Sequence, residues 1–143
     1  MTIEETLASV ELFAELEEED LKRLARVTVV RDYKAGDVIV KEGELGVAFY
    51  VVASGSVDVI KGLETEGEQV IATLGAGSFF GEMALFDNQV RSASVRAAED
   101  TQCLVLTKWD FNAELTASGC HIATALLVVL ARRIRGLTES ASH

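Results

Sequence analysis

Glycine-bearing turns divide residues 27–107 into short apolar runs, and this division limits the possible folds more than any other feature of the chain. The runs are rich in β-branched and aromatic residues, as is typical of strands. Many short strands in succession favour an antiparallel β jelly roll, in which inward side chains of two sheets share one core. The predicted strands are Val27–Tyr33, Val38–Val40, Val47–Ala53, Val57–Lys61, Gln69–Leu74, Ser92–Ala97 and Thr101–Thr107, with a further short strand at Phe79.

Helical patterns stand at both ends of the chain. Thr2 and Glu5 have the spacing of a capping box and predict a short helix. The acidic stretch from Glu17 to Asp20 predicts the start of a second helix, which ends near Arg26. After Lys108 the helical period returns, over residues 109–117 and from about 120 to 137. We therefore expect a mainly β fold with flanking helices.

The length and charge of the chain limit its organisation and its partners. A chain of 143 residues has room for one ordinary domain. We expect a single domain over residues 1–143, with helices over 1–26, the β roll over 27–107 and further helices over 108–138. The formal charge of −10 disfavours nucleic acid and anionic membranes, because both bind through cations. The longest apolar stretch, Ile122 to Ala131, is also too short to span a membrane.

The two cysteines, Cys103 and Cys120, lie among apolar residues. The sequence opens without the charged and apolar regions of a secretion signal, so we expect both thiols to be reduced and buried in a cytoplasmic protein. Two cysteines and two histidines do not have the spacing of an ordinary zinc site. No metal is expected.

The last predicted helix is apolar on more than one side. The apolar residues of one face are Ile122, Leu126, Leu130, Ile134 and Leu137. A helix of this kind needs two contacts. We expect one face to cover the β core, with Trp109 also in the core, and the other to meet a partner subunit, a second helix or a ligand. A homodimer through this helix is one of these alternatives.

One segment interrupts the β region with a different pattern. Glycines at 75, 77 and 81 precede a short helix-prone stretch, Glu82 to Phe86, and Arg91 stands at the entry to the next strand. Glycine lets a bound group approach the backbone, and the first turn of a helix offers N–H groups to anionic oxygens. An arginine can hold two phosphate oxygens at once. Glu82 fits beside such a phosphate if it accepts a hydrogen bond from a hydroxyl, for example a ribose 2′-OH.

The run Phe80-Gly-Glu-Met-Ala-Leu-Phe, continued by Arg91-Ser-Ala, resembles the phosphate-binding cassette of cyclic nucleotide-binding domains. Catabolite activator protein and the regulatory subunits of protein kinase A belong to that family. Further residues that match the pattern of this family occur across nearly the whole chain. They are Gly36-Asp37, Glu42-Gly43, Phe49 to Val52 followed by Ser54-Gly55, and Leu74-Gly75 with Gly77. The resemblance implies a cassette over residues 80–93 that binds a cyclic nucleotide.

The resemblance also implies a role for individual residues. Glu82 would bond the ribose 2′-OH and Arg91 the cyclic phosphate. Main-chain N–H groups of Ala84 and Ser92 would add bonds to the phosphate, and Gly81 would let the backbone come close. Threonine at the position of Ser92 tends to accompany cGMP, so the implied ligand is cAMP, with cGMP as the alternative. The other implied ligand contacts are Phe79, Ile71, Met83, Ala93 and Thr138.

The chain departs from the family pattern at a few positions. Val90 and Ala76 stand where the family frequently has proline. Because proline restricts a loop, we expect a looser cassette in the absence of ligand. The helix-turn-helix of related transcription factors has no counterpart within the 143 residues, so direct DNA binding is not expected.

Other interpretations stay open. Arg91 can pair with Asp87, and Glu82 can stand at a helix N-terminus because the helix dipole favours it there.

We expect a non-catalytic sensor that passes its occupancy through the last helix to an effector protein of unknown identity. One alternative is an interaction domain of the same fold whose cassette does not bind nucleotide and which regulates a partner by protein–protein contact. Another is a cupin-type metalloenzyme, which needs several histidines, whereas His121 and His143 both lie outside the β region.

Overall fold

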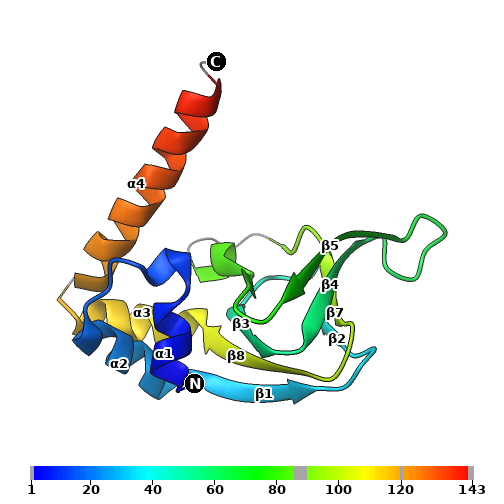
Figure 1. Cartoon of the computed structure of the whole chain (residues 1–143), viewed down its shortest axis with the longest axis horizontal. Helices are drawn as coiled ribbons and strands as arrows, with labels where there is room; N and C mark the ends of the chain where they lie inside the picture. Colours follow the sequence, from blue (N-terminus) through cyan, green and yellow to red (C-terminus); the bar gives the residue numbers. More distant parts are fainter. Residues whose placement is uncertain (1, 86–89, 120, 142–143) are drawn as a thin grey trace. The chain divides into compact units, whose positions relative to one another are not determined.

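The computed structural model describes residues 2–85, 90–119 and 121–141. Its elements separate into two compact units. One unit, Thr28–Asp110, holds the strands, and the other consists of the helical segments up to Val27 and from Phe111 onward (Figure 1).

Two four-stranded antiparallel sheets make up the β unit (Figure 1). The first sheet contains, in spatial order, β1 (Val29–Tyr33), β8 (Thr101–Thr107), β3 (Ala48–Ser54) and β6 (Phe79–Phe80). The second contains β2 (Val38–Val40), β7 (Ser94–Ala97), β4 (Ser56–Lys61) and β5 (Gln69–Gly75). Every predicted strand is present, with its ends shifted by no more than two residues. The antiparallel jelly roll is confirmed.

Side chains from both sheets form the core of the β unit. The first sheet contributes residues of β3, β6 and β8, and the second contributes Val57 and Val95. Cys103 on β8 belongs to this core and carries a free, buried thiol, as predicted. Burial raises the pKa of this thiol to about 11. Cys120 lies outside the described residues.

The helical unit contains the predicted helices and one further turn. Its elements are α1 (Ile3–Ala8), the 3-10 turn η1 (Glu11–Phe13), α2 (Glu18–Val27), most of α3 (Lys108–Ala117) and α4 (His121–Ala141). The Thr2 hydroxyl accepts a hydrogen bond of 3.1 Å from the Glu5 N–H, which confirms the predicted cap of α1.

The structure corrects two expectations about the C-terminal segment. Trp109 is 62% exposed and does not lie in the core. In α4, which continues to Ala141, Ile122 and Leu126 are buried, but Ile134 is 65% and Leu137 68% exposed. Apolar periodicity shows which residues share a helix face but not how far other elements extend along it. The expected buried stripe is therefore wrong for its last two members.

Candidate functional site

The predicted cassette starts at the end of β6 and leads toward β7. Glu82–Leu85 form a short 3-10 helix, η2. Residues 86–89, which include Asp87, lie outside the described part of the chain. Val90 pairs with Leu45 in an isolated antiparallel bridge. The loop between β2 and β3 therefore lies beside the end of the cassette.

The side chain of Arg91 is partly buried and reaches β3. Its Nη2 donates a hydrogen bond of 2.7 Å to the carbonyl oxygen of Ala48. Its guanidinium carbon lies 5.9 Å from the centre of the Tyr50 ring, within the range of a cation–π contact. Tyr50 stacks in turn on Phe80, with ring centres 4.8 Å apart. A carbonyl oxygen and an aromatic face thus fix the position of this positive charge.

Burial and the nearby Arg91 charge both act on the pKa of Tyr50. Burial raises the pKa of Tyr50, and the positive charge of Arg91 acts in the opposite direction without cancelling the rise. The phenol is therefore neutral around neutral pH, and the ring offers the guanidinium a polarisable face without a countercharge.

Two glycines leave the space that the guanidinium occupies. At Gly81, where φ is +79°, a Cβ atom would overlap Nη1 of Arg91 and lie 3.0 Å from the Ala48 carbonyl oxygen. At Gly46 a Cβ atom would lie 3.1 Å from Nε of Arg91 and 3.2 Å from Cβ of Ala84. The structure thus brings three of the predicted residues, Gly81, Ala84 and Arg91, together with Gly46.

The main chain of Arg91 is held by the loop between β2 and β3. Its N–H donates to the carbonyl of Glu44 at 2.7 Å, and its carbonyl accepts from the N–H of Gly43 at 2.9 Å. The sequence indicated Glu42-Gly43 and the run from Phe49 as family matches but assigned neither a role at the site. These partners come from a distant part of the chain, so no local pattern around Arg91 could identify them.

The remaining predicted residues of the cassette lie in η2 and in the segment that leads into β7. The N–H of Ala84, a predicted phosphate donor, donates to the Gly81 carbonyl at 3.1 Å. Ser92 is exposed and Ala93 is partly buried. The backbones of Glu82 and Met83 belong to η2, but their side chains lie outside the description.

Three further predicted contacts lie on separate elements. Phe79 is on β6, with its ring centre 5.6 Å from that of Phe49. Ile71 is on β5 and is 51% exposed. Thr138 is in α4, within the helical unit, and its side chain lies outside the description.

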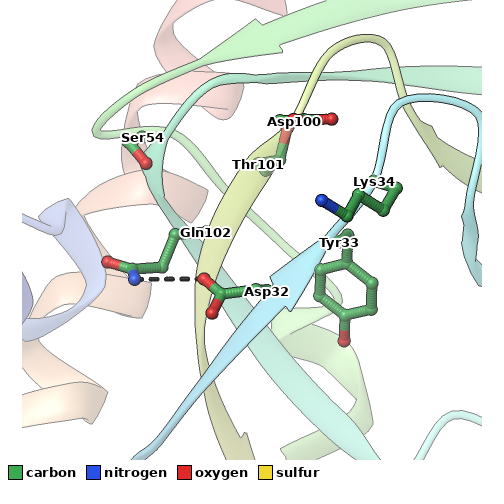
Figure 2. A pocket seen from close by; sticks show the side chains of 7 residues that line it. All are labelled: Asp32, Tyr33, Lys34, Ser54, Asp100, Thr101 and Gln102. Atoms are coloured by element: carbon green, nitrogen blue, oxygen red, sulfur yellow. Dashed lines mark hydrogen bonds between the residues drawn. The ribbon is translucent and has the colours of Figure 1, made fainter.

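A separate hollow of about 350 Å³ opens where β1 ends and β8 begins (Figure 2). Within it, the Gln102 side-chain amide donates to the Asp32 carboxylate at 3.1 Å. The lining residues are Asp32, Tyr33, Lys34, Ser54, Asp100, Thr101 and Gln102. None of them is a predicted ligand contact, so this hollow is distinct from the cassette.

Among the residues that the structure describes, no group of three or more histidine, cysteine or acidic side chains has an arrangement able to hold a metal ion. In the same part of the chain, no single helix has the length and apolarity to cross a membrane. The bent pair Lys108–Ala117 and His121–Leu137 meets those two criteria when counted together.

Known proteins resemble this chain over the region that carries the β roll. The family described as "Cyclic nucleotide-binding domain" matches residues 30–118. The human cGMP-dependent protein kinase 2 is 41% identical over 108 residues, which cover 74% of this chain and 14% of the kinase. The cyclic AMP receptor protein of Thermus thermophilus is 42% identical over 105 residues, which cover 73% of this chain and 48% of the receptor. The chain thus spans less than half the length of both relatives.

Solved structures show the same architecture. The N-terminal domain of a transcriptional regulator from Streptomyces coelicolor superposes with a TM-score of 0.86 at 30% identity, covering 94% of this chain and 95% of that domain. The catabolite activator protein of Thermus thermophilus superposes with a TM-score of 0.72 at 36% identity, covering 92% of this chain and 62% of the activator. On its fold and on the match of residues 30–118, the chain belongs to the cyclic nucleotide-binding domain family.

Proposed function

We propose that this chain binds a cyclic nucleotide, cAMP in the first place, as a non-catalytic cytoplasmic sensor domain. The observation that carries the proposal is the Arg91 guanidinium, which is bonded to the Ala48 carbonyl on β3 and fits the space left by Gly81 and Gly46. A positive charge fixed next to a glycine backbone and a 3-10 turn suits an anionic group that must approach the main chain closely.

The recognition chemistry follows from the residue types. A guanidinium has five N–H donors in one plane, enough to serve a carbonyl and a phosphate together. Glu82 is proposed to accept a hydrogen bond from the ribose 2′-OH. A site that bonds a hydroxyl discriminates strongly against a ligand without it, because its own polar group is then left unpaired.

The choice between cAMP and cGMP rests on Ser92. The two curated relatives named for the two nucleotides are almost equally similar to this chain, at 41% and 42% identity, so overall similarity favours neither. Serine in place of threonine at position 92 supports cAMP.

We propose further that occupancy is relayed to an effector protein through α4. A ligand shifts a two-state equilibrium only by the difference between its affinities for the two states. We propose that phosphate binding shifts the cassette, including Leu85 of η2, which is 4% exposed and therefore tightly packed. We propose α4 as the element that responds.

Exposed apolar residues of α4 support a second copy of the chain as its partner. Leu127 and Ile134 are seven residues apart, as are Leu130 and Leu137, and Leu127, Ile134 and Leu137 are each at least 65% exposed. A seven-residue apolar repeat lets two helices pack side by side. We propose a homodimer formed through this stripe.

Calorimetric titration with cAMP, cGMP and AMP tests the binding proposal. We expect cAMP to bind most tightly and 2′-deoxy-cAMP to bind much more weakly. Arg91→Leu should cost about 2–5 kcal/mol of binding free energy if the ion pair between the guanidinium and the phosphate is desolvated. Arg96→Leu is the matched control, because Arg96 lies on β7 and pairs with Glu68 at 4.0 Å. Equal affinity for 2′-deoxy-cAMP would remove Glu82 from its role.

The alternative is an interaction domain of the same fold whose cassette is silent. If none of the three nucleotides gives a heat of binding, although the protein unfolds cooperatively and is therefore folded, this alternative is favoured over the sensor. Tight binding of cAMP that is insensitive to Arg91→Leu would retain a sensor but move its phosphate site elsewhere.

A further inference from the structure

The segment that carries Arg91 into β7 is flanked by two other strands of its sheet. β7 lies between β2 and β4, with Val40 opposite Val95 and Ile60 opposite Ser94. Glu42 follows the end of β2, and Lys61 is the last residue of β4. The two side chains therefore reach the start of β7 from opposite sides.

Glu42 and Lys61 meet across that segment. Lys61 Nζ lies 3.6 Å from a carboxylate oxygen of Glu42 and donates a hydrogen bond to the Ser92 carbonyl. The other carboxylate oxygen of Glu42 accepts from the Gly62 N–H at 3.1 Å, and the Glu42 N–H donates to the Ser94 hydroxyl at 2.9 Å. We call this group of contacts the Glu42–Lys61 brace.

These contacts control the direction of two main-chain N–H groups. The described peptide bonds include no cis bond, and in a trans peptide the carbonyl and the following N–H point in opposite directions. The Gly43 N–H bonds the Arg91 carbonyl, which sets the direction of the Ser92 N–H. Lys61 bonds the Ser92 carbonyl, which sets the direction of the Ala93 N–H in the same way.

We propose that Lys61 and Glu42 are positioning residues for the anion site. Through the brace they hold the Ser92–Ala93 peptide in the orientation in which its N–H faces a bound phosphate, next to the guanidinium of Arg91. The proposal rests on the proposed function, since it assigns these residues to the same phosphate. The sequence assigned neither side chain a role at the site, because each is far from Arg91 along the chain.

A purely structural role predicts a different outcome. The side chains of Lys61 and Glu42 are 50% and 39% exposed, and exposed ion pairs contribute little to folding. Loss of the brace should therefore leave thermal stability nearly unchanged while it lowers nucleotide affinity. A residue that only stabilises the fold would, when replaced, lower thermal stability and leave the nucleotide affinity of the folded protein unchanged.

The test compares Lys61→Met with Lys61→Arg and with Lys34→Met in the full chain. Lys34 is the matched control, because it is an exposed lysine of the hollow described above (Figure 2). We expect Lys61→Met to weaken cAMP binding about three- to tenfold, the effect of one partly exposed charge-assisted hydrogen bond. Lys61→Arg, which keeps the charge and the donors, should recover most of the affinity, and Lys34→Met should bind as the unchanged protein does.

A double variant and a spectrum complete the test. Glu42→Gln combined with Lys61→Met should weaken binding no more than Lys61→Met alone, because the two residues act as one unit. In a ¹H–¹⁵N spectrum of the unliganded protein, Lys61→Met should shift the amide resonances of Ser92 and Ala93, and Lys34→Met should not. If the unchanged protein binds cAMP and Lys61→Met binds it equally well, the brace has no positioning role. If the unchanged protein binds no cyclic nucleotide, the proposed function itself fails.

Discussion

Substitution of Gly81 by alanine tests the geometry around Arg91 most directly. Gly81 has φ of +79°, a conformation that costs a residue with a Cβ atom about 1–2 kcal/mol. The added atom would also overlap Nη1 of Arg91 and lie 3.0 Å from the Ala48 carbonyl oxygen. The guanidinium must move away, and we expect this movement to break its 2.7 Å hydrogen bond to the Ala48 carbonyl.

Gly77 provides the matched control. It has a similar φ of +90°, but a Cβ atom at this position would meet nothing within 4 Å. Gly77→Ala therefore carries the conformational cost alone, about 1–2 kcal/mol. Gly81→Ala adds the loss of a partly exposed charge-assisted hydrogen bond, about 1–2 kcal/mol, for a total of about 2–4 kcal/mol of unfolding free energy.

Urea unfolding and calorimetric titration of the same samples separate the two contributions. We expect both alanine variants to lose stability, Gly81→Ala the more, and only Gly81→Ala to lose cAMP affinity by about tenfold or more. Equal loss of stability in the two variants would show that the guanidinium relaxes without cost. Normal cAMP binding by Gly81→Ala would show that the phosphate does not depend on the position of Arg91.

Three further predictions concern other parts of the chain. Thr2→Ala removes the cap of α1, in which the hydroxyl accepts from the Glu5 N–H at 3.1 Å, and should lower the unfolding free energy by about 0.5–1 kcal/mol; an unchanged urea midpoint would contradict this. The Cys103 thiol has its pKa raised by burial from 9.0 to about 11, so the unfolded chain loses this proton first and stability should fall as pH rises from 9 to 11. Thermal unfolding over that range should show a smaller decline in Cys103→Ala, and parallel curves would refute the assignment. Ile134→Glu should convert the proposed dimer to a monomer in sedimentation analysis, whereas an unchanged mass would exclude α4 as the interface.

Local patterns in the sequence were sufficient to predict the strands and the α-helices of this protein, although not the 3-10 turn η1. Turn residues and β-rich runs predicted each strand, and the spacing of Thr2 and Glu5 predicted the first helix, because these features depend on interactions between residues close together in the chain. The order of Gly81 and Arg91 within the cassette likewise indicated an anion site from the residue types alone.

The surroundings of those residues depended on the tertiary structure. Main-chain hydrogen bonds to the loop between β2 and β3 hold Arg91 near Ala48 and Tyr50. The pairing of β7 with β2 and β4 brings Glu42 and Lys61 to the segment that leads into β7. The exposure of Trp109 and Ile134 likewise depends on how far other elements extend, which an apolar pattern does not encode. Strand formation is a local property of the sequence. The register between strands and the burial of side chains under other elements arise only when separate segments pack together.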